Sequence, residues 1–102
     1  MGVREANVEK YLRSEVQKLG GDTRKWVCPG RAGVPDQIVG IPGITPEFVE
    51  VKTTDGKLSP GQEREHKRLF ETMGLNVKTV YGHAGVDALI STLKGRLSNA
   101  AP

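Results

Sequence analysis

Two carboxylates and an ammonium group in the middle of the chain have the residue types and the spacing that could bind a divalent cation. Asp36 follows the rigid turn Gly33-Val34-Pro35, and Glu50 lies fourteen residues later with Lys52 beside it. The Pro42-Gly43 turn between them predicts a hairpin, which would bring Asp36 and Glu50 close together at one end. Like charges that close repel unless a cation lies between them. Carboxylate oxygens suit a hard ion such as Mg²⁺ or Mn²⁺, which keeps its other positions for water and a phosphate oxygen.

The strand predicted around Glu50 separates its side chains onto two faces, because side chains two apart share a face. Phe48, Glu50 and Lys52 lie on one face, and Val49 and Val51 lie on the other. In so short a sheet this strand should be central, so a carboxylate and an ammonium group stand side by side within it. Two ordinary interpretations stay open here: an ion pair on a solvated edge, and a Pro-Asp turn without a chemical role.

A third carboxylate could come from the amphipathic helix predicted for residues 4–19. At 100° per residue, Glu5 and Glu15 fall within its apolar stripe, and Glu9 lies at the edge of that stripe. Periodicity does not choose among the three. Pairing with a lysine, or exposure at a frayed helix end, explains an inward glutamate equally well.

Gln62 has two competing roles in the sequence. As the third residue after Ser59 it completes a capping box at a helix start, which is a sufficient structural reason for a glutamine. Its helical spacing from His66 also places it on the inward stripe, where it could face the strand of Glu50 and bind a water or a phosphate. His66 on the same stripe is interpreted as a packed or rim histidine.

The elements that must position these residues follow the order helix, three strands, helix, strand, helix. Helices are predicted from a 3.6-residue period with start and stop signals, and strands from short apolar runs bounded by turns. The helices cover residues 4–19, residues 60–73 and a last segment with Val86, Leu89, Ile90, Leu93 and Leu97; the strands cover residues 23–28, 36–41, 47–52 and 75–81. This order predicts an α/β fold with a mixed central sheet flanked by helices, in which the strand–helix–strand unit permits a parallel pairing.

Composition limits the classes of protein that the chain can represent. With 102 residues, 36% hydrophobic and 26% charged, it is expected to form one domain over residues 1–97, with residues 98–102 as a disordered tail. No apolar run approaches the roughly 20 residues of a membrane span, and the N-terminus is polar, so we expect a cytoplasmic protein without a membrane partner. The single cysteine, Cys28, with only two histidines elsewhere, makes a zinc cluster very improbable. The formal net charge of +3 favours an acidic partner.

Three short motifs in a fixed order resemble a known family. The set Gly33-Val34-Pro35-Asp36, then Glu50-Val51-Lys52, then Ser59-Pro60-x-Gln62 is similar to the VRR-NUC domain of the PD-(D/E)xK nuclease superfamily, and most similar to its small stand-alone members in phages and bacteria. The likeness spans nearly the whole chain. The element order agrees with the restriction-endonuclease-like αβββαβ core of that superfamily, here with an additional C-terminal helix.

The resemblance implies roles for individual residues. Asp36 and Glu50 correspond to the metal-binding acids, with the backbone carbonyl of Val51 as a further ligand, and Lys52 corresponds to the motif lysine. Glu5 best matches the additional acid of the family, because Glu5-Ala-Asn-Val8-Glu9 resembles its E-x-x-hydrophobic-Q/E pattern, and Glu9 is the reserve. Gln62 resembles the family glutamine that follows the metal-binding strand.

The resemblance also implies an activity: Mg²⁺- or Mn²⁺-dependent hydrolysis of phosphodiester bonds in branched or junction DNA, by a homodimer whose candidate interface is the apolar last helix. Trp26 could stack on a base, although core packing is the more ordinary use of a single tryptophan. Two alternatives stay open, a non-catalytic DNA-binding module that keeps the fold and a small endonuclease specific for a site or lesion. Phosphate contacts are expected from basic residues around the site, namely Arg24, Lys25, Arg31, Lys57, Arg64, Lys67 and Arg68.

Overall fold

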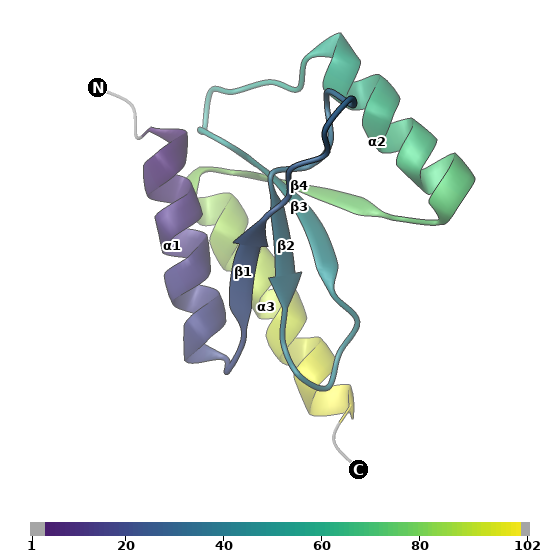
Figure 1. The fold of residues 1–102 in the computed structure, drawn as a ribbon. Coiled ribbons are helices and arrows are strands. Elements are labelled where there is room, and N and C mark those ends of the chain that lie inside the picture. Colours follow the sequence, from purple (N-terminus) through teal and green to yellow (C-terminus); the bar gives the residue numbers. More distant parts are fainter. Residues whose placement is uncertain (1–3, 101–102) are drawn as a thin grey trace.

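The computed structural model describes residues 4–100 and shows the predicted α/β fold with its C-terminal helix (Figure 1). Three helices alternate with strands in the expected order. The elements are α1 (Glu5–Lys18), β1 (Asp22–Lys25), β2 (Gln37–Gly40), β3 (Glu47–Lys52), α2 (Pro60–Met73), β4 (Val77–Tyr81) and α3 (Gly82–Ala100). None of the helices within this part of the chain is long and apolar enough to cross a membrane.

The four strands form one mixed sheet in the order β1-β2-β3-β4. β2 pairs antiparallel with both β1 and β3, and β3 pairs parallel with β4. A parallel pair needs a crossover connection, and α2 supplies it. The prediction that residues 47–52 form an interior strand is confirmed, since β3 has a neighbour on each side.

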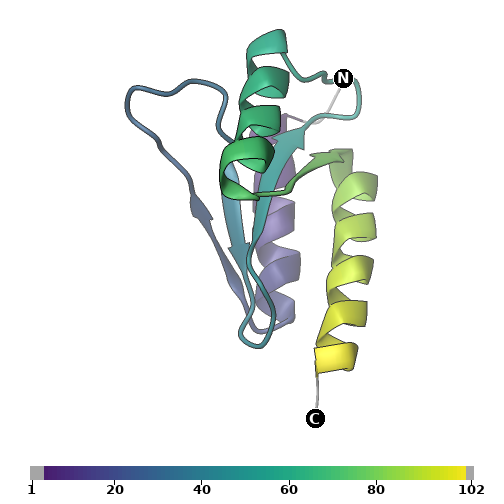
Figure 2. The same ribbon diagram turned by 90° about the vertical axis from the view of Figure 1, so that its right-hand side faces the viewer.

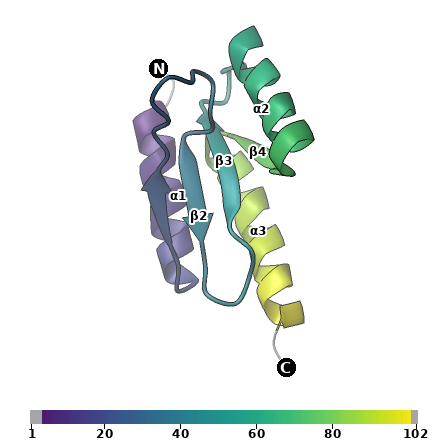
Figure 3. The same ribbon diagram turned by 45° about the vertical axis from the view of Figure 1, so that its right-hand side comes forward.

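Helices cover the two faces of the sheet unequally. Figure 3 shows α1 and α3 behind the strands, and Figure 2 shows α2 near one end of the sheet, away from α3. The hydrophobic core lies between α1, α3 and the sheet face that these two helices cover. It consists of buried aliphatic side chains, among them Leu12, Val49, Val51 and Leu93. Full burial of each such side chain contributes about 1.5–3 kcal/mol. The sheet face opposite this core, below α2, carries Glu50 and Lys52 together with the aromatic pair Trp26 and Phe48.

β1 ends earlier than predicted. The sequence predicts a strand over residues 23–28, whereas β1 stops at Lys25. Trp26 still donates its N–H to the carbonyl of Asp36 at 2.8 Å, but Val27 is 72% exposed. Beyond Trp26 the chain leaves the sheet and passes toward α2, as Figure 2 shows. The apolar residues Trp26 and Val27 therefore belong to a loop and not to the strand. A hydrophobic pattern over so few residues does not distinguish the two.

The bounds of α2 agree with the prediction. The way the helix ends shifts the start of β4 to a later residue than predicted. Gly74 adopts a left-handed conformation at φ 68°, and the N–H of Leu75 bonds the carbonyl of Leu69 at 3.2 Å. This closes the last helical turn and keeps Leu75 out of the sheet, so β4 starts at Val77 instead of residue 75.

The last helix is longer than predicted. α3 starts at Gly82, directly after β4, and continues through Ala100, so residues 98–100 of the expected disordered tail are helical. No proline or helix-ending glycine interrupts residues 96–100, which explains the continuation. Residues 101–102 lie outside the described part of the chain.

Candidate active site

The pairing of β2 with β3 brings Asp36 opposite Glu50. Gln37 pairs with Val49 in the observed register, and one step further along the antiparallel ladder Asp36 faces Glu50. Oδ2 of Asp36 accepts a hydrogen bond from the N–H of Val51 at 3.0 Å. Asp36 is therefore fixed at the end of the hairpin that the sequence predicts, with its carboxylate against the strand that carries Glu50.

Glu50 lies almost completely buried between the sheet and α2. Its side chain is 1% exposed. Gln62 Nε2 donates to Oε2 of Glu50 at 3.2 Å, and Lys52 Nζ lies 3.8 Å from the same oxygen. His66 Nε2 lies 3.7 Å from the other oxygen, Oε1. Four predicted residues, Asp36, Glu50, Lys52 and Gln62, are thus brought into one cluster.

The electrostatics of this cluster disfavour a second negative charge. Burial and the adjacent carboxylate of Asp36 raise the pKa of Glu50 to about 8, while Lys52 acts in the opposite direction. Oε1 of Glu50 and Nε2 of His66 are buried without a hydrogen-bond partner. Burial also lowers the pKa of His66, with Asp36 acting against it, so burial favours the neutral form of the ring. Ionisation of both carboxylates would therefore be only partly compensated by Lys52, and burial and Asp36 favour the protonated form of Glu50.

This donor set fits a hard divalent cation. Within residues 4–100, no group of three or more His, Cys, Asp or Glu side chains is arranged to hold a metal ion by itself. Asp36 and Glu50 offer two carboxylates, one with an unpartnered oxygen, and the backbone carbonyl of Val51 is adjacent. Mg²⁺ is commonly held in proteins by one or two carboxylates, with waters and substrate phosphates completing its shell. A cation held by these two carboxylates would keep positions for waters and a phosphate oxygen.

The structure narrows the choice of a helix acid. Glu15 forms an ion pair with Lys18 at 2.6 Å, which is the ordinary alternative considered for an inward glutamate. Glu5, at the start of α1, is exposed, and its charge contributes slightly to the raised pKa of Glu50. Glu9 is half-buried, and its pKa is raised by burial first and by Asp36 second. Both Glu5 and Glu9 therefore act electrostatically on the site, one turn apart on the same helix.

Gln62 completes the predicted capping box and also faces the strand of Glu50, where its side chain contacts the carboxylate of Glu50. Its N–H donates to Ser59 Oγ at 3.1 Å and its Oε1 accepts from the N–H of Ser59 at 2.9 Å, which completes the capping box. Its Nε2 remains to donate to Glu50. The two roles were alternatives in the sequence because a pattern does not show that different atoms of one amide serve them.

Gly33 sets the distance between the Asp36 loop and α2. Its φ is +86°, and a Cβ at this position would meet the carbonyl oxygen of Gly61 at 2.8 Å and Cβ of Glu65 at 3.1 Å. Only glycine combines this conformation with so close an approach. The motif glycine thus holds the loop before Asp36 against the helix that carries Gln62.

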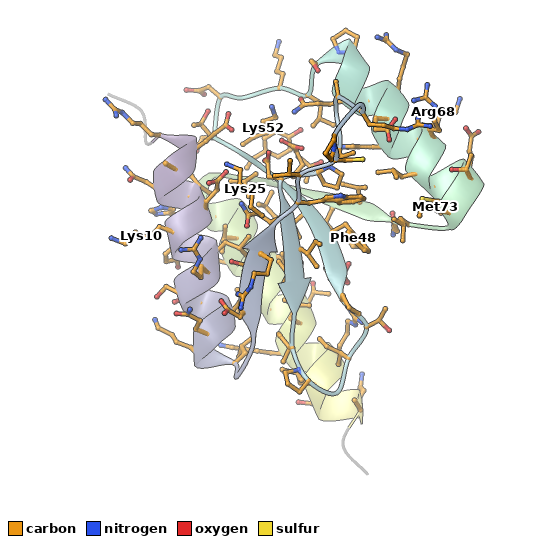
Figure 4. The ribbon with its side chains drawn as sticks, viewed as in Figure 1. Lys10, Lys25, Phe48, Lys52, Arg68 and Met73 are labelled. Atoms are coloured by element: carbon orange, nitrogen blue, oxygen red, sulfur yellow. The ribbon has the colours of Figure 1, made fainter. Side chains whose placement is uncertain are left out.

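The basic residues predicted to contact DNA fall into two groups. Lys25 and Lys52 lie near the end of the sheet that carries the site, as Figure 4 shows, and Lys57, Arg64 and Lys67 are exposed on the loop after β3 and on α2. Arg24 instead pairs with Asp22 at 2.7 Å. Arg31 and Arg68 both approach Glu65.

Sequence reasoning did not single out Glu65, and it favoured core packing for Trp26. Glu65 is buried beneath Arg31 and Arg68, and the i, i+3 spacing of Glu65 and Arg68 was the only available signal. Trp26 is half-buried and packs against Phe48 with ring centroids 5.3 Å apart, outside the main aliphatic core. It lies on the face of the sheet that carries the site.

The chain is a small α/β protein with two carboxylates and a lysine clustered at one end of its sheet, and comparisons with known proteins identify its family. No family model matches the chain. The chain is 52% identical over 68 residues to "Putative nuclease p44" of Acyrthosiphon pisum secondary endosymbiont phage 1, covering 67% of this chain and 73% of the relative. A solved structure described as "VRR_NUC domain" is 42% identical, with a TM-score of 0.76, over 85% of this chain and 94% of that chain. The chain belongs to the VRR-NUC nuclease family.

A second solved structure, "VRR_NUC domain protein", extends the likeness of the fold. It shares only 16% identity but has a TM-score of 0.69, over 96% of this chain and 91% of that chain. This match supports the fold alone. The predicted family and fold are confirmed, and membership of the family makes nuclease activity the general function of the chain.

Proposed function

We propose that this protein is a metal-dependent endonuclease that hydrolyses phosphodiester bonds in branched or junction DNA. The observation that carries the proposal is the pair of adjacent carboxylates, the half-buried Asp36 and the buried Glu50, with Lys52 Nζ at 3.8 Å from Glu50. Such a pair has an unfavourable charge balance in the isolated protein, and a divalent cation with a bound phosphate relieves it.

The proposed ligands of the metal are Asp36, Glu50 and the backbone carbonyl of Val51, with Glu5 as the third acid and Glu9 in reserve. Mg²⁺ and Mn²⁺ both suit these oxygen donors. When bound, the metal supplies Lewis-acid activation of the scissile phosphate and lowers the pKa of a coordinated water. The unpartnered Oε1 of Glu50 supports its role as a ligand.

The other residues prepare the site for that chemistry. Gln62 fixes one oxygen of Glu50 by its 3.2 Å hydrogen bond and so limits rotation of the carboxylate. The N–H of Val51 orients Asp36 in the same way. Lys52 has a side chain only 12% exposed, which holds its ammonium group in place to orient the attacking water and to stabilise negative charge on the phosphate in the transition state.

DNA binding is proposed for the basic residues that frame the site: Arg24, Lys25, Arg31, Lys57, Arg64 and Lys67. Such contacts position the phosphate backbone without reading the sequence, in keeping with selection by DNA structure. Because Arg24 forms an ion pair with Asp22, it contributes least to DNA binding in this set. We place the reaction in the cytoplasm, which is the host cytoplasm for a phage-encoded protein.

We also propose a homodimer, which would present two sites to two DNA strands. The apolar residues of α3 are not its interface, because Leu89, Ile90 and Leu93 are buried in the core of the same chain. This corrects the candidate interface taken from the sequence. Light scattering at micromolar concentration should give twice the chain mass, and a mass of 11.1 kDa would contradict the dimer.

A cleavage panel tests the proposed function. Labelled duplex, flap, splayed-arm and four-way (Holliday) junction DNA are incubated with the protein in Mg²⁺, Mn²⁺ or EDTA, and the products are mapped. We expect cuts near the branch point with either metal, little cutting of the plain duplex and none in EDTA. Chelator-independent binding without cleavage would indicate a non-catalytic module, and cutting of one duplex sequence would indicate a site-specific enzyme; either result overturns the proposal.

A further inference from the structure

A second concave surface lies beside the candidate active site, between α2 and residues 26–34. It is a cavity of about 380 Å³, within the size range of small-ligand sites. Trp26, Val34, Leu69 and Met73 supply much of its apolar lining. Figure 4 shows Met73 at the end of α2, on the side of the molecule where Phe48 lies. Nothing assigned to the metal site so far uses this cavity.

The cavity also carries a positive rim around a buried acceptor. The side chain of Glu65 is 4% exposed, while those of Arg31 and Arg68 are about half exposed. Arg68 Nη1 lies 2.6 Å from Glu65 Oε1, and Arg31 Nη1 lies 3.6 Å from it. Two guanidinium groups against one carboxylate leave a net charge of +1, so the rim attracts an anion while the interior is apolar.

The residues that line the cavity are neighbours of those in the candidate metal site. Trp26 donates its backbone N–H to the carbonyl of Asp36 at 2.8 Å, so the two residues lie opposite each other just beyond the paired ends of β1 and β2. Glu65 and His66 are consecutive on α2, with Glu65 lining the cavity and His66 near Glu50. A nucleotide whose phosphate is at the carboxylate pair therefore has this cavity within the reach of its base.

We propose that this cavity receives an unpaired nucleobase of the DNA, next to the phosphate that is cut; this inference rests on the proposed function. The base stacks on the indole of Trp26, which is a sequence-tolerant interaction. Arg31 and Arg68 neutralise the adjoining phosphates, and the carboxylate of Glu65 accepts from an N–H on the base edge. Unpaired bases are available at the branch points of DNA at little unstacking cost, which links the cavity to selection of branched substrates.

A second copy of this chain is the competing occupant. Val27, Phe70 and Met73 are exposed apolar residues near the cavity, and a dimer interface would cover them. In a two-fold dimer, however, the same patch meets itself, so the positive rims of Arg31 and Arg68 would face each other. Charge complementarity therefore favours a polyanion over a second copy.

The chain offers two native probes of this cavity, because its single tryptophan, Trp26, and its single cysteine, Cys28, both line it. Tryptophan fluorescence of the wild-type protein is titrated in EDTA, so that no cleavage occurs. The ligands are a splayed-arm DNA with normal bases at the branch and the same DNA with abasic sites there, which keeps every phosphate. We expect the normal DNA to quench Trp26 and to bind about 5- to 150-fold more tightly than the abasic DNA, given about 1–3 kcal/mol per stacked base.

Modification of Cys28 gives an independent readout. A bulky maleimide on Cys28 should fill the cavity and remove the difference between normal and abasic DNA, while the far-ultraviolet circular dichroism stays unchanged. A Cys28→Ala variant treated with the same reagent is the matched control and should keep the difference.

Two outcomes would overturn the base-binding proposal: equal affinity of the unmodified protein for both DNAs without quenching, or conversion of a dimer to monomers by the maleimide. Failure of this inference is distinguishable from failure of the proposed function. If metal-dependent cleavage is the same with and without abasic sites, only the base-binding proposal is wrong. If normal bases quench Trp26 but the protein never cleaves DNA, only the proposed nuclease mechanism is wrong.

Discussion

Asp36→Asn and Lys52→Ala are each expected to reduce metal-dependent cleavage of branched DNA by at least about 10²–10³-fold, the usual loss when one preorganised electrostatic group is removed. In Asp36→Asn the amide oxygen still accepts from the N–H of Val51, so the hairpin is kept while the charge toward a cation is lost. In Lys52→Ala the ammonium group that lies 3.8 Å from Glu50 Oε2 is removed. Initial rates of cleavage measure both effects.

Two exposed residues provide matched controls for these substitutions. Asp55 lies three residues after Lys52 on a loop, and Lys94 lies on the outer face of α3. Asp55→Asn and Lys94→Ala change the same charges as the two site variants and should cleave at the wild-type rate. Circular dichroism should show that all four variants are folded. Full activity of a folded Asp36→Asn or Lys52→Ala protein would remove these residues from the site.

Glu50→Gln is expected to stabilise the metal-free protein and to abolish cleavage. The pKa of Glu50 is raised from 4.5 to about 8, by burial first and by Asp36 second. A raised folded-state pKa means that the folded protein binds more protons than the unfolded chain, so stability falls as pH rises between these two values and the loss is complete above about 8. Glutamine does not ionise, so the stability of the Glu50→Gln variant does not fall with pH in this way.

Thermal unfolding in EDTA measures the stability difference directly. Near pH 5 the two proteins should have similar melting temperatures, and by pH 8.5 the variant should melt at least about 4 °C higher, the shift expected from about 1 kcal/mol in a domain of this size. Glu71→Gln, an exposed change on α2, is the control and should follow the wild type at both pH values. A variant that is less stable than the wild type at pH 8.5 would show that the carboxylate is not strained in the metal-free protein.

The sequence carried most of the information for the site because the site depends on local signals. A Pro-Gly turn fixes the hairpin and alternation fixes the face of Glu50, so the approach of Asp36 and Glu50 was predictable. The capping box of Ser59 and Gln62, with Pro60 between them, correctly predicted that α2 starts at Pro60. Each of these signals acts within a few positions of the chain.

Contacts across the fold could not be predicted in the same way. The approach of His66 to Glu50 and of Arg31 to Glu65 depends on how α2 lies over the sheet, and no single periodic pattern encodes that placement. Trp26 illustrates the difficulty, because its apolar character predicted core packing while the core is closed by aliphatic side chains from α1 and α3. The tryptophan remains on the opposite face, where it lines a cavity.

The most direct test of the central claim is the binding of Mn²⁺ to the wild-type protein and to Glu50→Gln, measured by isothermal titration calorimetry without DNA at pH 7.5. The claim is that Asp36 and Glu50 are held so close together that a divalent cation is needed between them. It predicts saturable binding to the wild type, with proton release because the carboxyl of Glu50 must ionise, and at least about tenfold weaker binding to the variant. Equal binding to both proteins, or no binding to the wild type, would contradict it.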